Sequence, residues 1–377
     1  MKLIVFLILL VILTGVELLI YRKHALSDLS FHVSFSRPIA QCGEIIEVIE
    51  VAQNNKRLPL PFILLKFESP DAFHFLDMSN TSVSDLFYRE DMLTMKPFSR
   101  HTRRIKVRCV KRGLYSFVRV NVSTSDLLLL EKITHTFDND ASITILPEKI
   151  TPPEMETLLS VSYSDLMARR TPLTDPMSFS GIREYRPEDP MRDINWTATA
   201  KAGDFMVNQT TSTCHRQVSI FVNLESYNLK DSVALLEKSL SLAYSYMIEL
   251  GNMGIPSRIF TNGKDIATGS PVTDILASDA PGLLRRGIAL ARIDLSAGVI
   301  PFSDLIEEYL PATGTDDYIV VISPRYKGLF QDTLRSIRSR RDSLLWVMPA
   351  FRTTPQVENA TDITGRYLRW EVKGNDR

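Results

Sequence analysis

The sequence is poor in the residues on which redox and zinc chemistry depend. Its 377 residues include six scattered histidines and three widely spaced cysteines, Cys42, Cys109 and Cys214. No pair of these residues has the spacing of a zinc site or a redox motif. We therefore expect reduced thiols in a cytoplasmic compartment. Cys109, which follows alternating basic and apolar residues, is expected on the inner face of a strand as a small core residue.

The chain also lacks an excess of charge and a glycine-rich phosphate loop. Its 44 basic side chains balance its 44 acidic ones, so no nucleic-acid footprint is indicated. A length of 377 residues exceeds one ordinary hydrophobic core and predicts two or three domains.

One long apolar run stands near the start of the chain, at residues 3–20. As a helix its eighteen residues reach about 27 Å, close to the roughly 30 Å of a bilayer core. Glu17 interrupts the run about one helical turn before Arg22. We expect the Glu17 carboxylate to lie near the lipid headgroups and to be partly neutralised there.

The same run has an alternative interpretation as a signal peptide, with Ala25, Leu26 and Ser27 as the cleavage site. Basic residues directly before that site disfavour cleavage, because signal peptides carry their positive charge at the front. We therefore predict an uncleaved transmembrane anchor over residues 1–27. Basic residues are concentrated after the apolar run, so we predict that the C-terminal domains lie in the cytoplasm. The protein is then a single-pass protein of the cell membrane.

Residues 28–150 have the pattern of short strands separated by turns. Val118, Val120 and Val122 are expected on one face of a strand, and Arg119 and Asn121 on the other. Regular strands of this kind predict an all-β sandwich. No nucleophile, general base or metal cluster occurs here, so the domain is expected to be a spacer or a docking module.

From residue 215 onward, strands alternate with helices. Apolar runs at 218–222, 318–322 and 344–348 have the length of buried strands, and residues 236–250 have the periodicity of an amphipathic helix. This alternation predicts an α/β domain over 215–377 with a mostly parallel sheet. Ligands of such sheets bind beyond the carboxyl ends of the strands.

A charged segment with two prolines lies between these domains, within a linker region that we place at 151–214. Its arginines can form forked bonds to neighbouring carboxylates, and its aromatic residues need packing partners. We interpret the segment as a structural latch. The candidate residues are Arg183, Glu184, Tyr185, Asp189, Arg192, Asp193, Asn195 and Trp196.

An enzyme or a small-ligand receptor is the alternative interpretation of this segment. A hydrolase-like site would use Asp189 or Asp193 as general base and Arg183 or Arg192 as an electrostatic clamp. A structural salt-bridge network uses the same residue types equally well. We predict no catalytic residue in the chain.

The order of residues at 181–201 resembles the signature of one bacterial family, catalogued as domain of unknown function 58. That signature contains an Arg-x-Tyr, a Gly-Asp and an Arg-x-Ile-x-Trp, followed by a small residue and a base. Glu188 stands where the family commonly has glycine, and Lys201 where it has arginine. The resemblance extends to residues 111–115, Lys-Arg-Gly-Leu-Tyr, and to residues 125–128, Ser-Asp-Leu-Leu.

This resemblance implies a small β-sandwich between the membrane and a von Willebrand factor A-like domain. It also implies a partner, a MoxR-like AAA+ ATPase, because such proteins are commonly encoded together. The expected function is that of a membrane-anchored adaptor in the assembly or maturation of other proteins, acting by protein–protein interaction.

Von Willebrand factor A domains often hold magnesium with Asp-x-Ser-x-Ser at the end of the first strand. The aligned positions here are Asn223, Glu225 and Tyr227, and Ser323-Pro324 replaces a later aspartate. Hard dications prefer several oxygen ligands with carboxylate charge among them. The site is therefore degenerate, and we predict neither a metal nor another cofactor.

Overall fold

The computed structural model describes residues 2–76, 81–83, 87–168, 179–186, 189–191, 194–210, 217–225, 229–275 and 280–372. Contacts divide the chain into two compact units. The first comprises Met1–Lys149, Leu236–Ser245 and Asn262–Ile300, and the second comprises Ile150–Leu235, Tyr246–Thr261 and Pro301–Arg377. The first unit thus takes in two segments from beyond residue 215.

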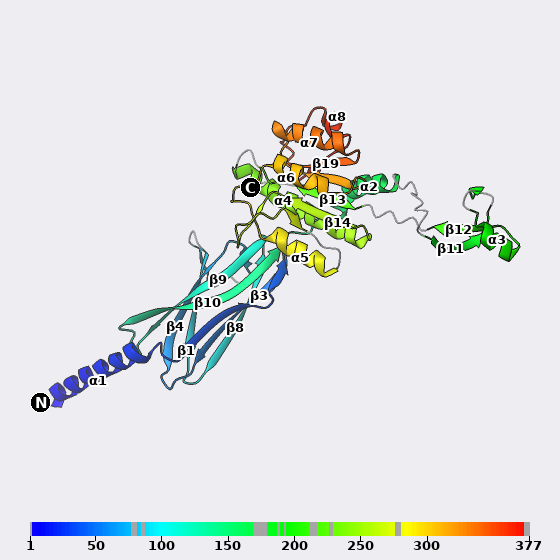
Figure 1. Ribbon diagram of the computed structural model, residues 1–377. Coiled ribbons are helices and arrows are strands. Elements are labelled where there is room, and N and C mark those ends of the chain that lie inside the picture. The colour runs from blue at the N-terminus through cyan, green and yellow to red at the C-terminus, as the bar shows by residue number, and fades with distance from the viewer. Residues whose placement is uncertain are drawn as a thin grey trace. The chain divides into compact units, whose positions relative to one another are not determined.

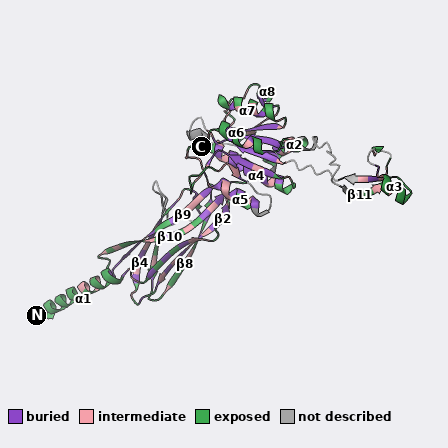
Figure 2. Cartoon of the chain, in the orientation of Figure 1, coloured by how far each residue is buried: buried purple, intermediate pink, exposed green. Residues whose placement is uncertain are grey.

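The chain begins with the apolar helix α1 (Lys2–His24), whose most apolar stretch has a mean hydropathy of 3.1. This helix is long and apolar enough to cross a membrane or to act as a signal sequence. Figure 2 shows that almost all of it is exposed. Tyr21 and Ala25, at its end and just after it, are instead buried and belong to the core of the following β domain.

That β domain is a sandwich of two sheets, as predicted from the strand pattern (Figure 1). One sheet has the order β1-β3-β8-β5, and the other has the order β2-β10-β9-β4-β7-β6. The strands are β1 (Leu29–Phe35), β2 (Ile39–Gln41), β3 (Ile45–Asn54), β4 (Leu60–Ser69), β5 (Phe73–Phe75), β6 (Thr81–Val83), β7 (Phe87–Met95), β8 (Arg100–Cys109), β9 (Gly113–Ser125) and β10 (Lys132–Leu146).

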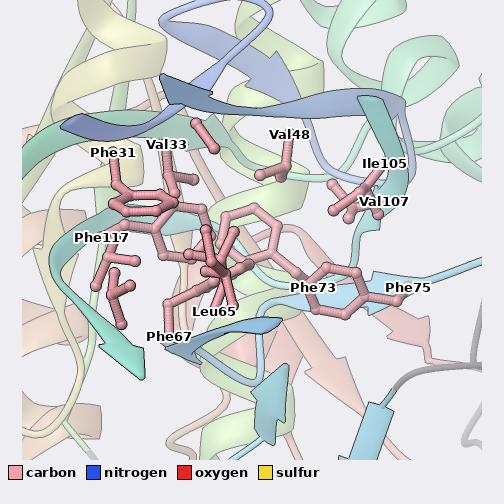
Figure 3. Close-up of a cluster of buried hydrophobic side chains, with 14 of the residues drawn as sticks. Phe31, Val33, Val48, Leu65, Phe67, Phe73, Phe75, Ile105, Val107 and Phe117 are labelled. Carbon is pink, nitrogen blue, oxygen red and sulfur yellow. The ribbon is translucent and has the colours of Figure 1, made fainter. Parts of the chain in front are cut away.

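Aromatic side chains fill the space between the two sheets (Figure 3). Phe117 stacks on Phe35 with ring centroids 4.8 Å apart and meets Phe67 edge-on at 5.1 Å. Burial of large apolar side chains of this kind is the main favourable term in folding. Cys109 is fully buried in the same core, which confirms its predicted place on the inner face of a strand.

The predicted face of β9 is wrong at one position. Val120 and Val122 are buried, but Val118 is 58% exposed and Phe117 points inward in its place. The reason is an irregularity in the pairing with β10, where the register shifts between Asp138 and Ala141. A bulge of this kind breaks the alternation of side chains.

The buried amide of Asn139 stabilises this bulge. It donates to the Phe117 carbonyl at 2.8 Å and accepts from the Val33 N–H at 3.0 Å. Backbone groups that the irregular ladder leaves unpaired are thereby satisfied inside the sandwich.

The end of α1 is joined to the sandwich by specific hydrogen bonds. The Tyr21 hydroxyl donates to the Pro59 carbonyl at 2.8 Å. The Lys56 ammonium donates to the carbonyl of Ala25 and, at 2.7 Å, to that of Ser27. These carbonyls follow the last helical turn, so a buried lysine satisfies acceptors that the helix leaves unpaired.

The acidic residue within α1 does not have the expected neighbour. Glu17 Oε1 accepts a hydrogen bond from the Leu127 N–H at 2.7 Å, and Arg22 lies 3.9 Å from Glu131. Arg22, about one turn from Glu17, thus lies nearest to Glu131, while Glu17 binds the β9–β10 loop.

The other segments of the first unit include β15 (Lys264–Asp265), β16 (Asp274–Ile275), α5 (Ala280–Ala291) and β17 (Ile293–Asp294). Buried Arg112 donates to the carbonyls of Leu290, Ala291 and Ile293 at 2.8–3.1 Å. A cation at the carboxyl end of α5 also complements the helix dipole. This contact attaches residues 262–300 to the sandwich.

The second unit contains a sheet in which β14 (Ser257–Thr261), β13 (Val218–Val222), β18 (Tyr318–Ile322), β19 (Leu344–Ala350) and β20 (Tyr367–Glu371) follow one another. The pairings between these neighbours are parallel. Its helical segments are α2 (Pro152–Ala168), α3 (Trp196–Ala202), α6 (Phe302–Tyr309), the 3-10 turn η2 (Leu310–Ala312), α7 (Leu329–Arg340) and α8 (Ala360–Thr364). Helix α4 (Leu229–Asn252) contributes residues to both units.

Every residue of β13, β18 and β19 is buried, as expected for parallel strands covered on both faces. Phe221 and Phe260 stack with ring centroids 4.6 Å apart, and Trp346 meets Phe330 edge-on at 5.6 Å.

The charged segment forms a small hairpin of β11 (Phe179–Glu184) and β12 (Met206–Thr210), which are antiparallel. Helix α3 lies between the two strands in sequence and contacts β12. We call these strands and this helix the signature hairpin.

Candidate functional site

The central strands of the second unit's sheet end side by side. β13 and β18 pair from Val218 and Tyr318 to Val222 and Ile322. The chain leaves β13 toward β14 on one side and later returns to β18 on the other. Such a reversal of strand order is where parallel sheets bind ligands, so the residues just after β13 and β18 form the first candidate site.

Asn223 and Ser323, directly after these strands, are completely buried and bonded to each other. The Asn223 amide Nδ2 lies 3.2 Å from Ser323 Oγ. Its Oδ1 accepts from the Glu225 N–H at 3.0 Å, and Ser323 Oγ accepts from the Arg325 N–H at 3.1 Å. The polar atoms that would face a metal ion are thus used within the protein.

The Glu225 carboxylate at this site is also bonded to groups of the protein. Glu225 Oε2 lies 2.7 Å from Arg325 Nη1, and both side chains are largely buried. Glu225 Oε1 accepts from the N–H of Phe302, the first residue of α6, at 3.0 Å. A carboxylate at a helix amino end is stabilised by the helix dipole as well as by its hydrogen bond.

Two of the three aligned metal-site positions therefore form a hydrogen-bonded lock at the strand ends. Tyr227, the third, lies outside the described residues. Among the residues that the structure describes, no group of three or more His, Cys, Asp and Glu side chains is placed to hold a metal ion. The structure adds Arg325, which sequence reasoning missed because nothing local links residues 225 and 325.

The second candidate site is the signature hairpin, where Arg183 and Asp189 form a forked pair. Arg183 Nη1 and Nη2 donate to the two Asp189 oxygens at 2.7 and 2.6 Å. The bonds from Arg183, together with the Arg186 N–H at 2.8 Å, lower the pKa of Asp189 to about 2. The predicted fork of arginine and carboxylate is confirmed for this pair.

Asn195 organises the start of α3. Its side-chain oxygen accepts from the Ala198 N–H at 3.0 Å, which is a helix N-cap. Its amide Nδ2 donates to Asn208 on β12 at 2.7 Å. Asn195 therefore links the helix to the hairpin, a role consistent with the latch interpretation.

The aromatic residues of the hairpin pack on one another. Trp196 meets Phe205 edge-on with ring centroids 6.4 Å apart, and the centroid of Tyr185 lies 6.1 Å from that of Phe205. Both predicted aromatic residues therefore have a packing partner. Phe205 covers only part of the indole, however, and Trp196 remains 64% exposed.

Among the described residues of this segment, Glu184 is not part of the fork. Glu184 is exposed, and its main-chain carbonyl, not its carboxylate, accepts from Arg183 at 3.0 Å. Arg192 and Asp193 lie outside the described residues. Sequence reasoning missed Phe205. Its only signal in the sequence is its position as an aromatic residue directly before the strand β12.

No family model matches the chain, and no curated protein matches it. Solved structures that are similar include the CARDB domain of a Pyrococcus furiosus protein in complex with di-metal ions, at 12% identity and a TM-score of 0.20, covering 31% of this chain and 92% of that chain. A non-cellulosomal cohesin from Archaeoglobus fulgidus has 11% identity and a TM-score of 0.20, covering 34% and 97%. A cohesin–dockerin complex from Clostridium thermocellum has 10% identity and a TM-score of 0.21, covering 31% and 99%.

Proposed function

We propose that the protein is a single-pass membrane adaptor that presents a von Willebrand factor A-like α/β domain to a protein partner on the cytoplasmic side. The partner implied by the resemblance to the domain of unknown function 58 family is a MoxR-like AAA+ ATPase. The complex would act in the assembly or maturation of other proteins.

The observation that carries this proposal is the exposed apolar surface of the signature hairpin. Trp196, Phe205 and Met191 are between 53% and 70% exposed, and Ile182 is 42% exposed. Clusters of exposed aromatic side chains and methionine are typical of protein–protein interfaces. Arg183 of the same hairpin, held by Asp189, adds a residue type that is enriched together with tryptophan in binding hot spots.

The junction of α1 and the sandwich supports an anchor that stays attached. Ala25, the first residue of the alternative cleavage site, is completely buried, and its carbonyl accepts from Lys56. Cleavage after Ser27 would remove Tyr21 and Ala25 from the core of the sandwich. The base at residues 22–24 favours the cytoplasmic orientation.

The parallel sheet and the strand-end lock support the A-like domain as a metal-independent binding module. Asn223 and Glu225 are committed to Ser323, Arg325 and the start of α6, so recognition would use loops and not a bound dication.

The alternative of a hydrolase-like enzyme is disfavoured at Asp189. A general base near neutral pH needs a pKa near 7, whereas the pKa of Asp189 is held at about 2 by Arg183. A carboxylate of this kind is a weak base and serves better as a structural partner.

The test is purification of the full-length chain in mild detergent, followed by identification of stoichiometric partners. We expect a MoxR-like ATPase with the wild-type protein and its loss from a Trp196→Ala, Phe205→Ala double variant. Leu329→Ala is the matched control, because Leu329 is 79% exposed on α7.

Circular dichroism should show that both variants fold like the wild type. Absence of the ATPase from the wild-type protein would refute the partnership. Its retention by the double variant would refute the assignment of the interface to the signature hairpin.

A further inference from the structure

The loop between β9 and β10 exposes four consecutive leucines, at residues 127–130. Their exposed fractions lie between 51% and 66%. A single exposed leucine is ordinary, but four in a row at the tip of a loop form an apolar surface that water disfavours. The rest of the sandwich offers them no cover.

Buried Asp126 holds this loop in shape. Its two carboxylate oxygens accept from the N–H groups of Leu128 and Glu131, at 3.1 and 2.7 Å. Leu129 has a φ of +58°, a left-handed conformation that leucine seldom adopts. The loop is thus a fixed turn that directs its leucines outward.

The position of the loop beside α1 identifies what covers the leucines. The Leu127 N–H donates to Glu17 Oε1 at 2.7 Å. Glu17 lies four residues before Tyr21, the residue at which the helix becomes buried in the sandwich. Four helical residues rise about 6 Å, so the loop lies alongside the apolar helix, beyond the edge of the sandwich.

The length of the apolar run determines how far α1 must be immersed in the bilayer. Residues 3–20 reach about 27 Å as a helix, slightly less than a hydrocarbon core of roughly 30 Å. A spanning α1 must therefore be immersed as far as Ile20. Glu17 lies three residues before Ile20, so its level, and that of the loop bonded to it, is about 5 Å inside the boundary of acyl chains and headgroups.

Other exposed residues at this end of the sandwich suit the same environment. Phe98 is 66% exposed, and its N–H donates to the carbonyl of Lys56, whose side chain binds the residues after α1. Five exposed basic side chains accompany two carboxylates, and this excess of basic residues attracts anionic headgroups. The basic residues are Arg22, Lys23, Arg57, Lys96 and Lys132, and the acidic ones are Asp28 and Glu131.

We propose that residues 127–130 insert into the bilayer beside α1 and seat the sandwich directly on the membrane surface. The loop is a second membrane contact, at the boundary of headgroups and acyl chains, where short apolar elements bind. Glu17 is tolerated in the apolar helix because the Leu127 N–H accompanies it. This inference rests on the proposed role of α1 as an anchor.

The test is site-directed spin labelling of the full-length chain in vesicles of phosphatidylcholine and phosphatidylglycerol. Cys214 is replaced by serine. Cys42 and Cys109 remain, because burial raises their thiol pKa values to about 11 and about 12 and keeps them unreactive at pH 7. A label count on the Cys214→Ser background verifies this.

Labels are then placed by Leu129→Cys, Leu10→Cys and Val118→Cys, and collisions with oxygen and with a water-soluble nickel complex are compared. Leu10 is the lipid reference on α1. Val118, 58% exposed, is the aqueous reference on β9, seven residues and about 23 Å from the end of the strand. Leu130→Cys replaces Leu129→Cys if the latter lowers the melting temperature.

We expect the labels at residues 129 and 10 to favour oxygen and the label at 118 to favour nickel. A lipid-exposed residue 10 with a water-exposed residue 129 would overturn the insertion of the loop and leave the anchor intact. A water-exposed residue 10 would overturn the anchor, and the insertion with it.

Discussion

The guanidinium Nε of Arg112 lies 2.7 Å from the Glu237 carboxylate, which joins the turn before β9 to the helix α4. Arg112 belongs to the Lys-Arg-Gly-Leu-Tyr stretch on which the family resemblance partly rests. In the sequence this stretch is only a turn. In the structure its arginine binds two segments that lie more than a hundred residues further along the chain.

Replacing Arg112 by methionine should therefore destabilise the first unit. Two carbonyls at the end of α5 and one in β17 would lose their donor, and we expect a loss of about 3 kcal/mol in the free energy of unfolding. Chemical denaturation in detergent measures this loss, and hydrogen exchange should show faster exchange in α5. Lys111→Met is the control, because the Lys111–Asp71 pair is exposed and should contribute less than about 1 kcal/mol. Equal effects of both variants would contradict this role of Arg112.

Arg103 bridges the two sheets of the sandwich in a similar way. Its Nη1 lies 2.6 Å from the completely buried carboxylate of Asp91. Arg103→Met would remove this countercharge, and loss of one partner of a buried pair typically costs about 3 kcal/mol. Denaturant titration checks the value. Arg104→Met, which breaks the more exposed pair with Glu47, should have a much smaller effect.

The lysine that binds the end of α1 should give the sandwich a pH-dependent stability. Burial lowers the pKa of Lys56 from 10.5 to about 8, against an opposing influence of Asp28. Between pH 8 and 10.5 the unfolded state then binds more protons than the folded state, so this residue's contribution to stability should rise with pH. Melting temperatures of the wild type and Lys56→Met, measured from pH 7 to 10.5, isolate the effect. If the melting temperature of the wild type fell relative to that of Lys56→Met as pH rises, the lowered pKa of Lys56 would be contradicted.

The fork of the signature hairpin should respond to acid in the opposite region of the pH scale. The pKa of Asp189 is lowered from 3.8 to about 2, so its stabilising effect is complete above pH 4 and is lost as pH falls through 2. Asp189→Asn should remove this dependence and loosen the hairpin while the two larger domains stay folded. Hydrogen exchange of residues 179–210 measures how far the hairpin loosens and how this depends on pH. Asp204→Asn is the control. Unfolding of the whole protein by Asp189→Asn would show that the hairpin supports far more than itself.

Calorimetry with Mg²⁺ and Mn²⁺ tests the strand-end lock. We expect no binding heat from the wild-type chain, because Asn223 and Glu225 are bound to Ser323 and Arg325. A variant with Asn223→Asp, Glu225→Ser and Tyr227→Ser restores the aligned metal-binding pattern and is the positive comparison. Full-length protein should be used, because a chain beginning at residue 28 would lack Tyr21 and Ala25 of the sandwich core. Clear binding by the wild type would revive a metal-dependent function.

Local patterns in the sequence were enough to predict the β-sandwich and the membrane-length helix. Alternation along β3 and β8 and the long apolar run before residue 21 are strong signals, because each is set by burial of one face or of a whole segment. Val118 shows the limit of this reasoning. Its outward position depends on a register shift opposite residues of another strand, which periodicity within β9 does not contain.

The sites were harder to predict, because their partners are distant in sequence. The fork of Arg183 and Asp189 spans six residues and was foreseeable from charge and spacing. Arg325 reaches Glu225 across one hundred residues, and Leu127 reaches Glu17 across more than one hundred. The exposure of Trp196 could not be predicted for a different reason, since residue type indicates a need for a partner and does not say how much of the indole that partner covers.

The burial of Tyr21 and Ala25 has a mechanical consequence. The apolar helix α1 passes into the β-sandwich without an intervening flexible tether, and its end is bonded to Pro59 and Lys56. In the anchor that we propose, a tilt of α1 would therefore be accompanied by a tilt of the sandwich, and the thickness of the membrane would influence the angle at which the sandwich stands.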